Sequence, residues 1–258
     1  MKNSIIVTAA EPLKFVETRF AKRVWQTVNY TRKYGKITFV FGESQIGKTS
    51  AIREYCNRTE GAHYVRMPSS PTLRLFVHDF AAALGAPERL TFPQRRRYIF
   101  NRLSRCDVVI VDEAHQAILT ERGLNPTQAK IFEFIREVYD AVGCGITICS
   151  TNVFETEMTS GALSGVLAQC NRRSLVTFHC PARPSAGDLA KFAEAHGLPE
   201  ITDEAKAEQA DVIKRECLGV WLTVLRMGCE IAGSQGRFVN WDDVVRAKRE
   251  RDAYNAKI

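Results

Sequence analysis

The chain of 258 residues contains no long apolar run. A membrane-spanning helix needs ~18 consecutive apolar residues, and no segment approaches that length, so a spanning protein is excluded. The apolar stretch before Glu11 and Pro12 is too short for a secretory signal, and we therefore expect a cytoplasmic protein. Internal repeats, low-complexity tracts and compositionally disordered segments are absent too, which indicates a globular protein of roughly one or two domains.

Closely paired cysteines are also absent. The eight cysteines form no C-x-x-C pair, and most of them lie within apolar segments. Zinc sites favour paired ligands on loops, whereas disulfide frameworks belong to small secreted chains. We therefore expect ordinary buried thiols.

Acidic residues are fewer than basic ones. The chain has 29 aspartates and glutamates against 36 lysines and arginines, which gives a net charge of +7, and its isoelectric point is near 9.0. Such a balance suits an anionic partner, but many proteins without one share it. Charge alone therefore assigns no function.

Short apolar segments of strand length alternate with helical patterns over the first two thirds of the chain. Strands are expected at 37–41, 64–67, 108–111, 146–150 and 175–178. Helices are expected at 13–34, 48–56, 72–84, 93–105, 127–142 and 161–170. This alternation predicts an α/β fold with a parallel five-stranded sheet flanked by helices on both faces.

Only helical patterns follow Pro181 and Pro184. These helices are expected at 186–196, 203–218, 220–232 and 241–253, the last one capped by Asn240. The proline pair therefore marks a predicted domain boundary. The predicted parts are an N-terminal helical segment over 1–35, an α/β domain over 36–183 and a small all-helical domain over 184–258.

Residues 42–49, Gly-Glu-Ser-Gln-Ile-Gly-Lys-Thr, match the phosphate-binding pattern G-x-x-x-x-G-K-[ST] at every fixed position. The segment follows an expected strand and opens an expected helix, which is the context that this motif requires. Glycines let backbone N–H groups wrap around phosphate oxygens, and the helix N-terminus adds about half a positive charge. Lys48 can reach the β- and γ-phosphates, and Thr49 can bind Mg²⁺. The alternative is a chance glycine-rich turn.

Two carboxylates, Asp112 and Glu113, follow the apolar strand at 108–111, at the strand end where ligands bind in parallel sheets. Asp112 would hold Mg²⁺ through water, and Glu113 would orient and polarise the attacking water as general base. The alternative is an acidic pair on the surface. The residues predicted to contact the nucleotide are Gly42, Glu43, Ser44, Gln45, Ile46, Gly47, Lys48, Thr49, Ser50 and Asp112, of which Thr49 and Asp112 are also the predicted metal ligands.

Together these features resemble an AAA+ ATPase over nearly the whole chain. Within that family, the compact size, residues 17–20, the run Asp112-Glu113-Ala114-His115 and the short helical end resemble the transposition regulators, the Mu B, TnsC and IstB-like group. The resemblance implies a P-loop α/β domain with a small C-terminal helical lid. It also implies an ATPase that uses ATP and Mg²⁺, assembles on duplex DNA as a homo-oligomeric ring or filament, and delivers DNA to a transposase that stimulates slow hydrolysis.

Further catalytic residues are implied by the same resemblance. In P-loop ATPases with an additional strand, the strand beside the acidic one ends in a polar side chain near the γ-phosphate, which indicates Asn152, with Thr151 as second choice. Asn152 could instead cap the following turn. An arginine from the neighbouring subunit completes such sites, and Arg172 or Arg173 stands at its usual position. The alternative for this pair is a solvated basic turn.

Two features depart from the family or invite another label. Leu222 stands where many lids carry an arginine, and Arg226, one helical turn later, is the candidate substitute. The Asp-Glu-Ala-His run also occurs in DEAH helicases, but those need two recombinase-like domains, which this chain cannot hold beside a lid. His115 is expected either to pack or to couple DNA binding to Glu113.

The candidate DNA contacts are Arg74, Arg95, Arg97, Arg102, Arg122 and Lys130. Arg95, Arg97 and Arg102 lie on the helix expected at 93–105, opposite its apolar stripe, and Arg105 lies on the same side. Arg96 lies within the apolar stripe. The others lie in segments that line the central passage of AAA+ rings. No base-reading helix is recognisable, so binding should be sequence-tolerant and salt-sensitive. The alternative is a solvated basic face.

Two other functions are alternatives to a transposition regulator. A helicase loader or replication initiator is a related AAA+ ATPase, although it normally carries an extra partner-binding or DNA-reading domain. A signalling ATPase would use nucleotide as a switch and bind no DNA.

Overall fold

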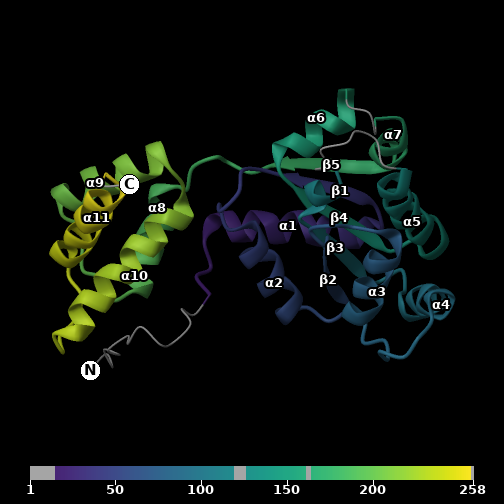
Figure 1. Cartoon of the computed structure of the whole chain (residues 1–258), viewed down its shortest axis with the longest axis horizontal. Coiled ribbons are helices and arrows are strands. Elements are labelled where there is room, and N and C mark those ends of the chain that lie inside the picture. The colour runs from purple at the N-terminus through teal and green to yellow at the C-terminus, as the bar shows by residue number, and fades with distance from the viewer. Residues whose placement is uncertain (1–14, 119–125, 161–163, 257–258) are drawn as a thin grey trace. The chain divides into compact units, whose positions relative to one another are not determined.

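The computed structural model describes residues 15–118, 126–160 and 164–256 (Figure 1). The chain divides into two compact units. The larger comprises Arg23–Ser44 and Lys48–Cys180, and the smaller comprises Met1–Lys22, Gln45–Gly47 and Pro181–Ile258. No helix within the described ranges is long and apolar enough to cross a membrane.

The larger unit is built on a five-stranded sheet in which every strand pair is parallel. The strands are β1 (Ile37–Phe41), β2 (Ala62–Arg66), β3 (Val108–Asp112), β4 (Gly145–Ser150) and β5 (Ser174–His179), in the order β2-β3-β4-β1-β5. The predicted α/β fold with a parallel five-stranded sheet is therefore confirmed. Because the strands are parallel, the segments that follow β1, β3 and β4 emerge at one edge of the sheet, where ligands bind in such folds.

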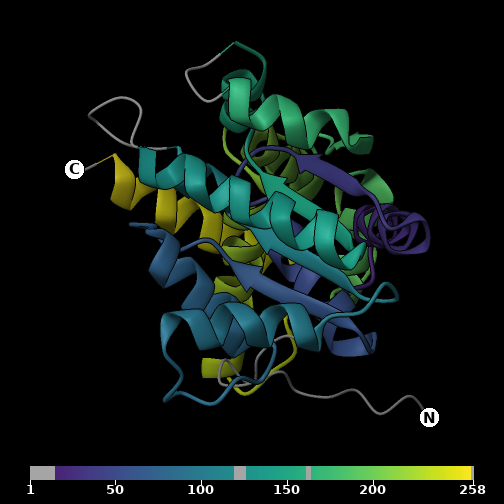
Figure 2. The same cartoon turned by 90° about the vertical axis from the view of Figure 1, so that its right-hand side faces the viewer.

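One helix precedes β1, and the others of this unit connect its strands. They are α1 (Arg19–Tyr34), α2 (Lys48–Arg58), α3 (Leu73–Ala83), α4 (Phe92–Arg102), a 3₁₀ turn η1 (Ala114–Ala117), α5 (Pro126–Val142), α6 (Asn152–Ser160) and α7 (Ser164–Arg172). Figure 2 looks onto the sheet face that α5 crosses. Side chains alternate between the two faces of a strand. On β1, Phe39 accordingly joins the core beneath α3 and α5, whereas Thr38 accepts a hydrogen bond from Thr31 of α1.

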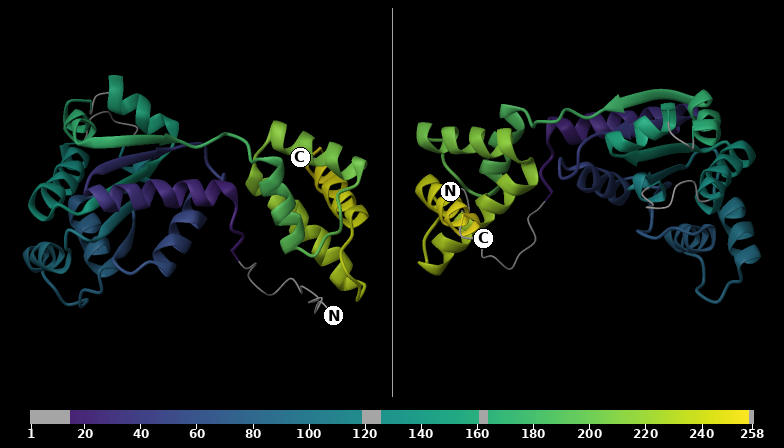
Figure 3. Two further views of the ribbon diagram at one scale, coloured as in Figure 1. Left: turned by 180° about the vertical axis from the view of Figure 1, so that it is seen from behind. Right: turned by 45° about the horizontal axis from the view of Figure 1, so that its top comes forward.

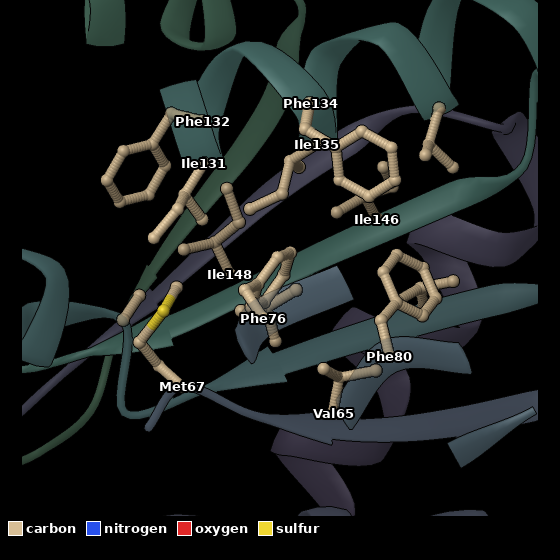
Figure 4. Close-up of a cluster of buried hydrophobic side chains, with 14 of the residues drawn as sticks. Val65, Met67, Phe76, Phe80, Ile131, Phe132, Phe134, Ile135, Ile146 and Ile148 are labelled. Carbon is tan, nitrogen blue, oxygen red and sulfur yellow. The ribbon is translucent and has the colours of Figure 1, made fainter. Parts of the chain in front are cut away.

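The core beneath α3 and α5 is rich in phenylalanine (Figure 4). Phe76 and Phe80 of α3 and Phe134 of α5 meet edge to face, with ring centroids 5.9 to 6.5 Å apart. Their side chains point toward apolar residues of the sheet such as Val65 and Ile146. Burial of each ring stabilises the fold by roughly 1.5–3 kcal/mol, which fixes the two helices against the strands that carry the site.

The C-terminal residues of the smaller unit form a group of helices (Figure 3). These helices enclose a hydrophobic core of their own. The helices are α8 (Ala186–Ala195), α9 (Asp203–Arg215), α10 (Leu218–Ser234) and α11 (Trp241–Asn255). Trp221 and Val224 of α10 and Val244 of α11 are almost completely buried in this core. Asn240 caps α11 as predicted, since its side chain accepts a hydrogen bond from the backbone N–H of Asp243.

Several helix boundaries differ from those predicted. The first helix begins at Arg19 rather than at 13, because the hydroxyl of Thr18 accepts from the N–H of Ala21 and so begins the helix there. The helix expected at 93–105 ends at Arg102, and Arg105 lies outside it. Helix α6 was not predicted, although Phe154 and Met158 are buried from it at helical spacing.

The cysteines are free, but not all of them are buried. Cys144, Cys149, Cys170 and Cys229 are buried, whereas Cys56, Cys180 and Cys217 are half-buried and Cys106 is exposed. Burial raises the pKa of the Cys144 thiol to about 12, which keeps it protonated and unreactive. The prediction of ordinary buried thiols was therefore wrong for Cys106, which lies in the exposed turn before β3.

Candidate nucleotide-binding site

The loop between β1 and α2 has the backbone that a phosphate-binding turn requires. Gln45 and Gly47 have φ values of 62° and 97°, in the left-handed region that favours glycine. The N–H of Gly42 donates to the carbonyl oxygen of Ser150 at 3.3 Å, so the start of the loop is attached to the end of β4. The loop, residues 42–49 (the P-loop below), therefore begins at the sheet edge and ends in the first turn of α2.

Lys48 is folded back over this loop. Its Nζ donates to the carbonyl oxygens of Gly42 and Glu43, each at 2.7 Å. The ammonium group thus lies beside the loop backbone, at the N-terminus of α2, where the helix dipole also favours an anion. Lysine and helix end together form a positively charged position suited to a phosphate group.

Asp112 connects the acidic strand to the P-loop. The residue is only 1% exposed. Oδ2 accepts from the hydroxyl of Thr49 at 2.7 Å and from the hydroxyl of Tyr64 at 3.1 Å, and Oδ1 accepts from the N–H of Glu113 at 2.9 Å. The structure therefore brings the two predicted metal ligands, Thr49 and Asp112, into direct contact.

Tyr64, from β2, is a site residue that sequence reasoning missed. Burial and then the charge of Asp112 raise the pKa of the Tyr64 phenol to about 12, so the hydroxyl remains protonated and able to donate. The guanidinium of Arg53 lies 4.8 Å from the centre of the ring. The sequence placed Tyr64 in a strand, but only the pairing of β2 with β3 brings it to Asp112.

Glu113 has an unusual backbone for a residue other than glycine. Its φ of 57° lies in the left-handed region, which costs roughly 1–2 kcal/mol. Its Oε2 lies 3.4 Å from Nε2 of His115, whose side chain is only 12% exposed. Within the described ranges, Nδ1 of His115 is buried and has no hydrogen-bond partner. Backbone strain of this kind occurs preferentially at functional sites.

Asn152 is the first residue of α6, directly after β4 and Thr151. Its Nδ2 donates to Oε1 of Glu43 at 2.7 Å. The amide therefore reaches the P-loop. The structure brings Asn152 together with Glu43, Lys48, Thr49 and Asp112 at one edge of the sheet.

The oxygen atoms present suit a magnesium ion. The Thr49 hydroxyl and the Asp112 carboxylate, 2.7 Å apart, are the hard oxygen donors that Mg²⁺ prefers. In the described segments, no group of three or more His, Cys, Asp or Glu side chains could hold a metal ion by itself. Mg²⁺ commonly takes its remaining ligands from phosphate and water, so a site with few protein ligands fits it.

The two candidate finger arginines lie in different surroundings. Arg173 forms a double hydrogen bond with Asp140, at 2.9 and 3.1 Å, and also donates to the carbonyl oxygen of Gln169. Arg172, the last residue of α7, is exposed. Arg172 makes no hydrogen bond or ion pair with any residue that the structure describes. The structure brings neither arginine to the P-loop of its own chain.

The candidate DNA contacts also differ in their availability. Arg74, Arg97, Arg102 and Lys130 are exposed, whereas Arg95 is half-buried and donates to the carbonyl oxygen of Glu88. Arg122 lies outside the described residues.

Arg96 is occupied within the fold. It forms an ion pair with Glu137 of α5 at 2.6 Å, and its guanidinium lies 5.2 Å from the centre of the Phe134 ring. These contacts explain how an arginine is accommodated on the apolar stripe of α4.

In the helical part of the smaller unit, Leu222 packs against the core, while Arg226 is exposed on α10. The apolar packing of Leu222 is consistent with its place on the buried side of α10.

Comparison with known proteins gives one family model and several relatives. Residues 31–157 match the AAA domain. The chain is 24% identical over 262 residues to the "ATP-dependent target DNA activator B" of Escherichia phage Mu, covering 97% of this chain and 78% of that protein. It is 25% identical over 153 residues to the "Mu-like prophage FluMu DNA transposition protein B" of Haemophilus influenzae, covering 57% of this chain and 49% of that protein.

Solved structures show the same fold. Domain III of the Thermotoga maritima replication initiation protein DnaA is similar with a TM-score of 0.60 and 16% identity, over 93% of this chain and 98% of that one. A Thermotoga maritima RuvB variant is similar with a TM-score of 0.52 and 15% identity, over 89% of this chain and 67% of that one. At these identities the likeness concerns the fold alone.

Proposed function

We propose that this chain is an AAA+ protein of the Mu B-like transposition-regulator group and that it acts as an ATP-dependent DNA-binding protein that delivers target DNA to a transposase. Its AAA domain makes it a nucleotide-binding ATPase in general terms. The proposal adds that the nucleotide is ATP with Mg²⁺, that hydrolysis is slow, and that DNA and the transposase stimulate it.

The contact between Thr49 and Asp112 carries the proposal, because it places a P-loop hydroxyl and a strand-end carboxylate at one point. Lys48 and the backbone N–H groups of the P-loop bind the phosphates, and Thr49 and Asp112 would hold Mg²⁺, which offsets phosphate charge when bound. Glu113 orients and polarises the attacking water. Asn152 donates to the terminal phosphate.

Assembly and DNA binding are the remaining parts of the proposal. A neighbouring copy supplies Arg172, whose exposure leaves it able to reach another subunit's nucleotide. Exposed arginines on α4 and nearby helices bind phosphates of duplex DNA without reading bases. ATP then stabilises the assembly because it binds at the junction of two copies.

The alternatives have weaker support. Likeness to a replication initiator rests on fold at 16% identity, whereas the curated relatives that cover the chain are named for target DNA activation. A signalling ATPase would make no use of the exposed arginines of α4. Measuring retention of the protein on DNA distinguishes a signalling ATPase from the proposed function.

The experiment that tests the proposal measures retention of the full chain on random-sequence duplex DNA, with and without ATP and Mg²⁺. The wild-type protein should be retained only with ATP. Lys48→Ala should lose both nucleotide binding and retention, because the phosphates lose their cation. Glu113→Gln should bind ATP, stop hydrolysing it and remain on DNA longer than the wild type.

Each result has a counterpart that would contradict the proposal. Unchanged ATP affinity in Lys48→Ala would remove the phosphate assignment. Normal turnover in Glu113→Gln would remove Glu113 as the base. ATP binding without any retention on DNA would favour the signalling ATPase.

A further inference from the structure

Glu43 occupies a P-loop position that the motif does not specify. The pattern fixes Gly42, Gly47, Lys48 and Thr49, and it leaves position 43 to any residue. The backbone of the loop therefore does not explain a glutamate there. Its side chain is exposed, so packing does not explain it either.

The carboxylate of Glu43 nevertheless has a specific partner. Its Oε1 accepts from Nδ2 of Asn152 at 2.7 Å, across 109 residues of sequence and between the segments that follow β1 and β4. The carbonyl oxygen of the same residue accepts from Nζ of Lys48 at 2.7 Å. Glu43 thus accepts hydrogen bonds from both of the side chains that the proposed function assigns to the phosphates.

A carboxylate and a terminal phosphate are competing acceptors for these donors. If Asn152 turns to the phosphate, its charge-assisted hydrogen bond to Glu43 is lost. If Asn152 uses its second N–H and keeps Glu43, two anionic groups come close together and repel each other. Either arrangement costs free energy only when a third phosphate is present, so Glu43 opposes ATP more than ADP.

We propose that Glu43 is a positioning residue that holds Asn152 in the nucleotide-free protein and sets how strongly the site prefers a triphosphate over a diphosphate. This inference rests on the proposed function, in which the P-loop binds ATP and Asn152 meets its terminal phosphate. Release of Asn152 from Glu43 makes the end of β4 responsive to that phosphate. Glu43 therefore sets the ATP level at which the site becomes occupied.

Calorimetric titration of the full chain with MgADP and with MgATPγS tests the inference. Glu43→Gln keeps the shape of the side chain but removes its charge. It should raise affinity for ATPγS about threefold to tenfold while changing affinity for ADP less than about twofold. In an Asn152→Ala background the same substitution should have a smaller effect, because one of the two competing contacts is already gone.

The matched control is Glu60→Gln, which removes the same charge from an exposed position beyond the far end of α2. It should leave the preference for ATPγS over ADP unchanged. An equal change for both nucleotides in Glu43→Gln would overturn the inference, as would an equal shift in the Glu60 variant. A wild-type chain that binds neither nucleotide would instead overturn the proposed function, so the two failures are distinguishable.

Discussion

Asp112 is a buried carboxylate whose oxygens are shared among several elements of the larger unit. Thr49 of α2, Tyr64 of β2 and the backbone of Glu113 all donate to it. A buried carboxylate needs such partners, because each missing hydrogen bond costs on the order of 1–3 kcal/mol. In the proposed site Thr49 turns to the metal, and Tyr64 and the Glu113 N–H then keep the carboxylate in place.

Tyr64→Phe should weaken the response of the site to Mg²⁺. The variant loses the phenolic donor but keeps the ring beneath Arg53, so the fold is preserved. Loss of a residue that orients a metal ligand costs about tenfold or more in metal affinity, and the Mg²⁺ concentration for half-maximal hydrolysis should rise accordingly. The measurement is a Mg²⁺ titration at fixed ATP, followed by both turnover and ATP binding.

Tyr30→Phe is the matched control, since Tyr30 is 42% exposed on α1 and its ring lies beside that of Tyr34. It should leave the Mg²⁺ titration unchanged. Equal titrations for the wild type and the Tyr64 variant would show that the tyrosine does not orient Asp112.

Helix α4 shows how one element divides its arginines between two tasks. Arg96 is tied to Glu137 and lies over Phe134, so it belongs to the packing of α4 on α5. Arg95 is engaged with the carbonyl oxygen of Glu88. Arg97 and Arg102 are exposed, and they are the α4 arginines best placed to bind phosphates.

Changing both Arg97 and Arg102 to Glu should weaken ATP-dependent DNA binding without altering ATP affinity in the free protein. Each lost phosphate contact lowers the slope of log affinity against log salt by about one, so the slope should fall by about two. DNA retention measured from low to moderate salt gives both the affinity and the slope.

A charge-matched variant separates contact from general repulsion. Changing Lys33 and Lys36 to Glu alters net charge by the same amount on another exposed part of the larger unit. Equal losses of DNA binding in the two variants would mean that α4 has no special role.

At the scale of the whole molecule, the proposed active site is incomplete in a single copy. Arg172 is exposed, whereas Arg173 is held by Asp140 of α5. An arginine that completes a phosphoryl-transfer site accelerates hydrolysis by about a thousandfold or more. The division of the chain into 1–35, 36–183 and 184–258 stays a prediction at this scale, as does the choice between ring and filament.

Arg172→Ala should therefore bind ATP normally as free protein and hydrolyse it at least about a hundredfold more slowly when assembled on DNA. Arg173→Ala should mainly lose an exposed ion pair, with a stability effect of about 1 kcal/mol or less. Steady-state ATPase assays with and without DNA measure the first effect, and thermal unfolding measures the second.

Mixing two inactive variants shows whether the arginine acts between copies. Arg172→Ala and Glu113→Gln in equal amounts should recover up to about a quarter of wild-type turnover, because random head-to-tail neighbours sometimes combine an intact base with an intact arginine. No recovery from variants that still assemble together would show that Arg172 does not act in trans.

The sequence by itself determined the parallel α/β fold, the P-loop and the acidic strand end. Those features are local: short apolar strands, a turn whose glycines allow left-handed backbone, and a lysine that begins a helix. The pairing of Thr49 with Asp112 could be anticipated as well, since parallel strands bring their C-terminal ends to one edge.

Only the tertiary structure decided which side chains meet across that edge. Tyr64 reaches Asp112 because β2 pairs with β3, and Glu43 reaches Asn152 because β4 lies beside β1. Strand order follows from the packing of the whole sheet, and no local pattern encodes it. Tertiary packing also decided the roles of two adjacent arginines. Arg96 forms an ion pair with Glu137, whereas Arg97 remains exposed.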